Sequence, residues 1–106
     1  MLYTRVNQRY TQHMEIESIS HKALRRFVES GSTKGLLEPG RIGDMIAFIV
    51  AAGSFNELAT PPNFGFHPLS ADRAGTFAMT VTRNWRMTFT KVDDTTIDNL
   101  DLEDYH

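Results

Sequence analysis

The hydrophobic pattern of this chain changes its period once, near the middle, and that change restricts the folds the chain can adopt. Up to Gly53, apolar residues recur at the spacing of α-helices, whereas beyond Asn63 they alternate with polar residues as in half-buried strands. The 106 residues are enough for one domain with a single core and leave no room for a second. Helices followed by a run of strands predict an α+β domain.

Two helices are expected in the first half of the chain. The first covers residues 21–30, with the hydroxyl of Ser20 as its N-cap and Gly31 as its stop. The second begins at Pro39, a favourable first helical residue, and ends before Gly53. It is more apolar than one buried face requires, which fits either a central core helix or a surface that a partner covers.

The second half predicts a hairpin with one buried face. Residues 77–81 and 85–89 alternate between apolar and polar side chains, and residues 83–84 form the turn between them. If the large apolar side chains of the second strand face the helices, Arg86 must point to the opposite, open face of the sheet. Arg86 is then either a solvated sheet residue or an anion-binding group.

Shorter strands are expected on either side of this hairpin. A strand over residues 64–68 ends at a proline, and a last strand covers residues 96–103. The apolar pattern of the last strand slips between Ile97 and Leu100, which predicts a β-bulge. Residues 16–19 form a further candidate edge strand.

Composition excludes several classes of protein. The chain has no cysteine, so disulfide scaffolds, thiolate zinc sites and cysteine nucleophiles are ruled out. No phosphate-binding glycine loop, HExxH motif or GxSxG motif occurs. With 11 Lys and Arg against 13 Asp and Glu, the formal charge is -2, so bulk positive charge cannot explain binding to a nucleic acid.

Neither a membrane span nor a secretory signal is expected. The longest apolar run covers residues 45–52 and is far shorter than the roughly 20 residues that cross a bilayer. The first 13 residues are polar and lack the apolar core of a signal peptide, so a cytoplasmic protein without membrane association is expected. Residues 1–13 are interpreted as an N-terminal arm or extension and residues 14–106 as the folded domain.

The polar residues that stand out lie mainly at the end of the chain. Residues 103–106 combine two carboxylates, a phenol and an imidazole, and His67 and Arg86 lie upstream. By itself such an ending is more readily a frayed tail than a site. His67, next to a proline at a strand end, is more often a satisfied polar residue than a functional one.

Five stretches of the chain stand in an order and at spacings found in one known family. They are His21-Lys22-Ala23-Leu24-Arg25-Arg26-Phe27, Gly31-Ser32-Thr33-Lys34-Gly35, His67-Pro68-Leu69 with Asp72-Arg73-Ala74-Gly75, Asn84-Trp85-Arg86-Met87-Thr88-Phe89, and Glu103-Asp104-Tyr105-His106. These stretches resemble the HigB-type (host inhibition of growth) toxins of the RelE/ParE superfamily, the toxin half of type II toxin–antitoxin pairs. The resemblance implies a compact RelE-like fold, with two N-terminal helices packed on a twisted antiparallel sheet of about four strands.

The resemblance also implies an enzyme that cleaves messenger RNA in the ribosomal A site without a metal ion or another cofactor. Its catalytic positions correspond to His67, Arg86, Asp104, Tyr105 and His106. Attack by the 2′-hydroxyl of the RNA needs a base, an acid for the leaving 5′-oxygen and a cation on the phosphate. Imidazole serves as base or acid near neutral pH, and arginine binds phosphate oxygens through its planar fork.

These roles divide the reaction among the implied side chains. His67 and His106 are expected to share the proton transfers with Arg86 on the phosphate, and which histidine is the base stays open. Asp104 is expected to hold His106 in one tautomer, and Tyr105 to stack on a base or bond the ribose. An alternative makes Asp104 the base. Strand alternation would aim Asp104 and His106 at the core face, so the tail must turn away for the site to assemble.

Five basic residues are candidates for contacts with RNA or the ribosome. They are Lys22, Arg25, Arg26, Lys34 and Arg73. For the first four, a solvated helix face is the commoner explanation. Arg73 is as readily a brace for its own loop as a ligand for phosphate.

The resemblance also implies a partner, a helix-turn-helix antitoxin that neutralises the toxin. The toxin–antitoxin pair would contact operator DNA only through this antitoxin. Two departures from the family predict attenuated cleavage: Ser70 stands where many relatives place a lysine, and the chain is acidic. Two alternatives stay open. One is a catalytically weak module that mainly binds its antitoxin, and the other is a ParE-like inhibitor of DNA gyrase, against which the acid–base residues argue.

Overall fold

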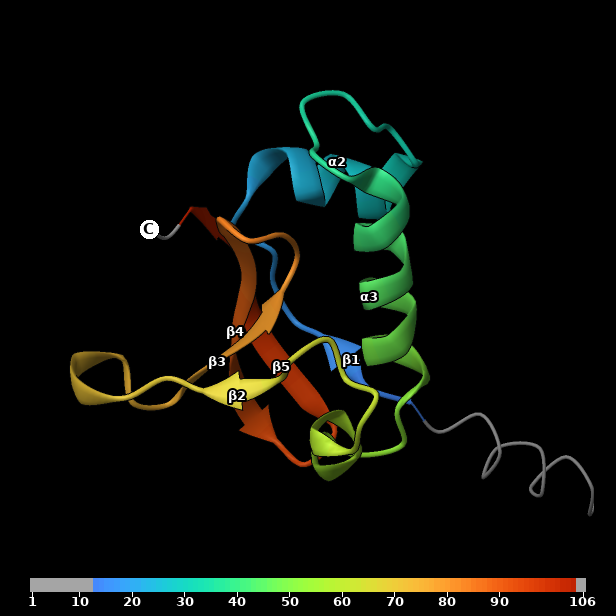
Figure 1. Cartoon of the computed structure of the whole chain (residues 1–106). Coiled ribbons are helices and arrows are strands. Elements are labelled where there is room, and N and C mark those ends of the chain that lie inside the picture. Colours follow the sequence, from blue (N-terminus) through green and yellow to red (C-terminus); the bar gives the residue numbers. More distant parts are fainter. Residues whose placement is uncertain (1–12, 105–106) are drawn as a thin grey trace, which may run out of the picture.

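The computed structural model describes residues 13–104 of the chain (Figure 1). Its elements, in chain order, are β1 (Glu15–Ile16), α2 (Lys22–Ser30), α3 (Pro39–Ala51), the 3-10 helix η1 (Phe55–Ala59), β2 (His67–Pro68), the 3-10 helix η2 (Ala71–Arg73), β3 (Thr76–Thr80), β4 (Trp85–Asp93) and β5 (Thr96–Asp104). Helices therefore precede most of the strands, as the change of period predicts.

The five strands form one sheet in the order β1-β5-β4-β3-β2. Strands β2 to β5 pair antiparallel with one another, as predicted. β1 lies at the other edge and pairs parallel with β5, with Glu15 opposite Thr96 and Ile16 opposite Ile97. The edge strand expected over residues 16–19 is present as β1, over residues 15–16. Its parallel pairing was not predicted, and the sheet is mixed with five strands instead of antiparallel with about four.

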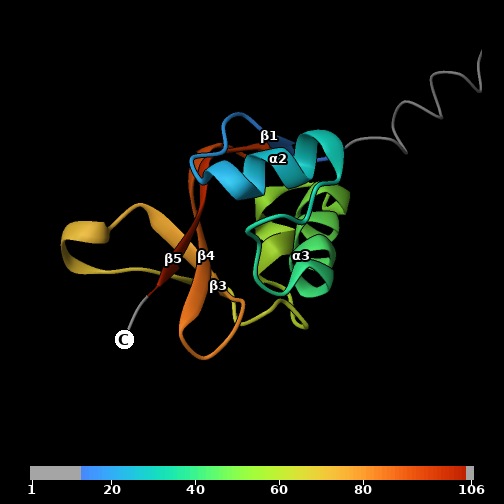
Figure 2. The same ribbon diagram turned by 90° about the horizontal axis from the view of Figure 1, so that it is seen from above.

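Helices α2 and α3 lie on one side of the sheet and leave its other face open (Figure 1, Figure 2). The core lies between these two layers, and the residues that form most of it are at most 5% exposed. They are Leu24, Ile42, Met45 and Ile49 of the helices and Met79, Met87, Phe89, Ile97, Leu100 and Leu102 of the strands. The prediction of an α+β domain with two helices packed on a sheet is confirmed.

Helix α3 is the central core helix. It buries Ile42, Met45 and Ile49 completely against the sheet. Its second apolar face is partly covered by the chain itself, since the ring of Phe48 meets the ring of Phe64 edge-on at 5.6 Å between centroids. Within residues 13–104, no helix is long and apolar enough to cross a membrane.

The folded core includes Met14, which is 1% exposed. Its backbone N–H donates to the carbonyl of Val50 at the end of α3, over 3.2 Å. Residues 1–12, most of the expected arm, lie outside the described residues. The boundary between arm and domain therefore stays a prediction.

The start of α2 differs from the prediction by one residue. The N-cap is His21, whose Nδ1 accepts from the N–H of Leu24 at 3.2 Å, and not Ser20. The backbone N–H of Ser20 instead donates to the carbonyl of Leu100 in β5, which ties the residue to the sheet. The predicted stop is right, because Gly31 adopts the left-handed conformation with φ 79 and closes the helix on the carbonyl of Phe27.

The strand expected over residues 64–68 is shorter than predicted. β2 contains only His67 and Pro68, because Phe64 has a positive φ of 56 and lies in a turn. The bulge in β5 is confirmed. The register with β4 shifts between Thr88 and Thr90, so that Asn99 and Leu100 together occupy the place opposite Phe89.

Candidate active site on the open face of the sheet

The face of the sheet away from the helices carries rows of polar side chains. Residues directly opposite each other on neighbouring strands point to the same face, so the register identifies these rows. One row runs Thr80–Arg86–Glu103, and the next runs His67–Ala78–Thr88–Asp101. Because Met87 and Phe89 are buried in the core, Arg86 points to the open face, as predicted.

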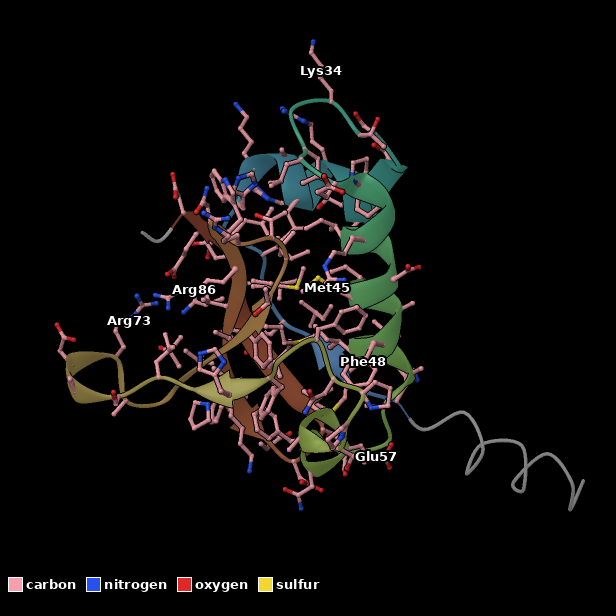
Figure 3. All side chains as sticks on the ribbon, in the orientation of Figure 1. Lys34, Met45, Phe48, Glu57, Arg73 and Arg86 are labelled. Carbon is pink, nitrogen blue, oxygen red and sulfur yellow. The ribbon has the colours of Figure 1, made fainter. Side chains whose placement is uncertain are left out.

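Glu103 is the centre of this face. Its Oε2 accepts from Arg73 Nη2 at 2.8 Å and from Thr88 Oγ1 at 2.9 Å. Its Oε1 accepts from Arg73 Nη1 and from Arg86 Nη2, both at 3.3 Å. Figure 3 shows Arg73 and Arg86 on the same side of the sheet, away from α3. One carboxylate of β5 thus gathers two guanidinium groups and a hydroxyl from two other parts of the chain, η2 and β4.

These contacts keep Glu103 ionised. The hydrogen bonds from Arg73 are the largest cause that holds the pKa of Glu103 below its ordinary value of 4.5, against the opposing effect of burial. Hydrogen bonds from Thr88 and Arg86 lower the pKa further by smaller amounts. The same hydrogen bonds raise the pKa of Arg73. Two positive charges and one negative charge therefore stand together, and the side chains of Arg86 and Glu103 are only 18% and 24% exposed.

Beside this cluster the surface is hollowed. A shallow polar depression of about 200 Å³ is lined by Arg73, Thr88 and Glu103 together with Ser20, Thr76, Phe89, Thr90, Asn99 and Asp101. Enclosed sites for small molecules usually measure about 300–1,000 Å³. The open face therefore suits a chain-like ligand that lies across it better than a small molecule held within it.

His67 lies on the same face as Arg86, two strands away. Its side chain is exposed, and its Nδ1 lies 2.8 Å from the carbonyl oxygen of Gly65. A carbonyl only accepts, so Nδ1 is the donor in this contact, and Nε2 is the ring nitrogen left to accept a proton. From strand spacing and rise, the Cα atoms of His67 and Arg86 are separated by roughly 12 Å.

The C-terminal residues divide at the end of β5. Asp104 is exposed and lies opposite Trp85, so strand alternation places it on the side away from Arg86 and His67. The structure therefore does not bring Asp104 together with them. Tyr105 and His106 lie outside the described residues. β5 continues as a strand as far as Asp104, so the expected turn toward the open face does not include Asp104.

The five predicted RNA contacts separate into two groups. The first group is exposed and comprises Lys22, Arg25, Arg26 and Lys34. Lys34 projects from the loop after α2, well apart from Arg73 and Arg86 (Figure 3). Arg73, in η2, is joined to the site through its ion pair with Glu103.

Glu103 itself was missing from the predicted site. A sequence signal for it exists, since Leu102 belongs to the apolar pattern of β5 and the next residue must face the other way, beside Arg86.

Among residues 13–104, no group of three or more His, Asp or Glu side chains is placed to hold a metal ion.

Comparison with known proteins gives one informative match. No family model matches the chain. Among solved structures, the toxin–antitoxin complex RelBE2 from Mycobacterium tuberculosis shares 20% identity with a TM-score of 0.45, over 89% of this chain and 99% of that chain. Endoribonuclease HigB of Proteus vulgaris is 38% identical over 94 residues, which cover 86% of this chain and 99% of the relative. At that identity over nearly the full length of the relative, the chain belongs to the HigB endoribonuclease family.

Proposed function

We propose that this protein is the toxin of a type II toxin–antitoxin system and cleaves messenger RNA on the translating ribosome, without a metal ion. One observation carries the proposal: the register of β2, β3 and β4 puts His67 and Arg86 on the same open face of the sheet. The name of its relative, Endoribonuclease HigB, supports the same activity. The polar face suits an extended polyanion because it is shallow and carries two arginines.

The chemistry uses the RNA as its own nucleophile. The 2′-hydroxyl attacks the adjacent phosphorus, its proton passes to a base, and the P–O bond to the 5′-oxygen breaks. The products are a 2′,3′-cyclic phosphate and a 5′-hydroxyl end. Nε2 of His67 is the proton acceptor, because Nδ1 is occupied by the carbonyl of Gly65. Protonation of the leaving oxygen is assigned to His106, with Tyr105 stacked on a base.

Arg86 supplies the cation for the phosphorane. Its guanidinium is largely shielded from water, with 18% of the side chain exposed, and Glu103 fixes its direction. A fixed cation in a partly dehydrated position stabilises developing charge more than one that must reorganise. A linkage between two nucleotides spans the gap of roughly 12 Å between the Cα atoms of His67 and Arg86 once both side chains reach toward it.

Binding to the ribosome is assigned to the exposed basic residues near α2. Lys22, Arg25, Arg26 and Lys34 present four cations to solvent at one end of the molecule. The formal charge of -2 makes the overall attraction to RNA weak, so affinity depends on this local group. The cytoplasm is the corresponding place of action, and a helix-turn-helix antitoxin is the corresponding partner.

The proposed activity is attenuated. Ser70 provides no cation where many relatives have a lysine, and Glu103 offsets part of the positive charge of Arg73 and Arg86. Cleavage should therefore be slower than in relatives that carry a lysine at the position of Ser70. Replacing Ser70 with lysine should accelerate it.

Expression of the chain alone, followed by mapping of transcript 5′ ends with and without translation, tests the proposal. Codon-phased cuts that vanish when translation is blocked are the expected result, and Arg86→Ala should abolish them. Arg83→Ala, which changes an exposed arginine in the β3–β4 turn, is the matched control. Intact transcripts with unchanged growth would contradict the ribonuclease and indicate a binding module. DNA damage with intact transcripts would indicate a gyrase inhibitor.

A further inference from the structure

Arg73 reaches the site from the connection between β2 and β3, far from β5 in the sequence. We infer that Arg73 and Glu103 form a positioning pair that holds Arg86 in place for the RNA phosphate, and that Arg73 acts through Glu103 without touching the RNA. This inference rests on the proposed function, and it assigns to Arg73 a role different from the RNA contact that the sequence suggests.

The geometry of the Arg73 side chain supports the inference first. Both terminal nitrogens, Nη1 and Nη2, donate to the two oxygens of Glu103, at 3.3 and 2.8 Å. This is the end of the guanidinium fork that binds a phosphate through two parallel hydrogen bonds. An Arg73 that grips Glu103 in this way does not offer the same fork to the RNA.

The surroundings of Glu103 support it further. Thr88, 2% exposed, donates to Oε2 from below, so the carboxylate is held from the sheet side as well as from the loop side. Arg86 then meets a carboxylate that is itself fixed by two other groups. A guanidinium oriented by a fixed partner keeps the geometry that catalysis requires.

The charge balance gives Arg73 a second effect on Arg86. With both arginines present, the cluster of Arg73, Arg86 and Glu103 carries one net positive charge. Without Arg73, the carboxylate of Glu103 would pair with Arg86 alone and neutralise it. Loss of Arg73 should therefore harm the reaction through Glu103, and removal of the Glu103 charge should relieve part of that harm.

A double-mutant cycle on cleavage by the intact protein tests this coupling. Arg73→Ala and Glu103→Gln should each lower kcat about tenfold with KM for programmed ribosomes unchanged, and the double variant should be no slower than Arg73→Ala alone. Arg73→Lys should restore kcat only in part, because an ammonium group keeps the positive charge but cannot make the fork. Arg83→Ala is the control, and melting temperatures establish that each variant is folded in the assay. Multiplying effects in the double variant, or a rise in KM with kcat unchanged for Arg73→Ala, would overturn the inference.

A readout independent of cleavage separates this inference from the proposed function. NMR relaxation of the Arg86 Nε–H group should show an ordered side chain in the wild-type protein and a mobile one in both Arg73→Ala and Glu103→Gln. This holds even for a protein that cleaves no RNA, in which case only the proposed function fails. An Arg86 side chain that stays equally ordered in both variants contradicts the positioning pair, whatever the cleavage assay shows.

Discussion

Arg86 of β4 and Glu103 of β5 lie directly opposite each other on the open face of the sheet, and Arg86 Nη2 donates to Glu103 Oε1 over 3.3 Å. This pair connects the cation of the proposed reaction to the last strand, one residue before Asp104. It also means that the main cation of the site is held by the sheet and not by a loop. Sites on strands keep their geometry better than sites on mobile connections.

Replacement of Arg86 by alanine should lower RNA cleavage by about 100-fold, because a fixed charge on the phosphorane is lost. The fold should survive, since Glu103 keeps its hydrogen bonds from Arg73 and Thr88. The measurement is the single-turnover rate on programmed ribosomes, with circular dichroism as the check on folding. A folded Arg86→Ala protein that cleaves at the wild-type rate would remove Arg86 from the mechanism.

Two histidines offer a matched comparison. His67→Ala should slow cleavage by about 100-fold or more without a change in stability, because an exposed proton acceptor is lost. His21→Ala should leave the cleavage rate per folded molecule intact and lower the free energy of unfolding by about 1 kcal/mol, because the cap on Leu24 N–H is lost. Urea unfolding and cleavage assays on both variants check this. Equal effects of the two substitutions on both quantities would contradict the assignment.

Glu103 should make stability depend on pH in the acid range. Its pKa is lower in the folded protein than its ordinary value of 4.5, so its contribution is fully present above that value and is lost as the pH falls through the folded pKa. Glu103→Gln should cost about 1 kcal/mol of unfolding free energy at pH 7, and the gap to wild type should close below about pH 4.5. Urea titrations between pH 3 and pH 7 measure it. If the difference in unfolding free energy between wild type and Glu103→Gln grew as the pH fell, the ionised form of Glu103 would not stabilise the fold.

The bulge in β5 should tolerate only certain residues at Asn99. Asn99 has a φ of 54, a left-handed conformation that Asn and Gly adopt readily and β-branched residues do not. Asn99→Gly should be nearly neutral, whereas Asn99→Val should lower the unfolding free energy by about 1–2 kcal/mol. Thermal unfolding of the two variants measures this difference. Equal melting temperatures would show that the bulge does not impose a left-handed backbone conformation at position 99.

Short-range patterns in the sequence were sufficient for much of this arrangement. Alternation over residues 85–89 predicted the face of Arg86, Pro39 marked the start of α3, and the slip between Ile97 and Leu100 predicted the bulge. Each of these signals depends on neighbours a few residues apart, where local sterics and burial act directly.

Contacts between distant parts of the chain could not be predicted from these local signals. Glu15 pairs with Thr96 from the opposite end of the sequence, so nothing local indicates the parallel edge. The hydrogen bonds from Arg73 to Glu103 depend on the path of the β2–β3 connection, which has a positive φ at Ala71 and at Gly75. No periodic pattern in the sequence predicts this path. Glu103 was within reach, because the alternation that predicted the face of Arg86 also applies to β5.

The chemical ends of the cleaved RNA test the central claim most directly. Programmed ribosomes carrying messenger RNA would be treated with the purified protein in the presence of a metal chelator, and a single 2′-O-methyl group would be placed at the cut linkage in a matched message. The unmodified message should be cut to 2′,3′-cyclic phosphate and 5′-hydroxyl ends, undiminished by the chelator, and the methylated linkage should stay uncut. Ends bearing a 5′-phosphate, or cleavage that continues at the methylated linkage, would contradict it.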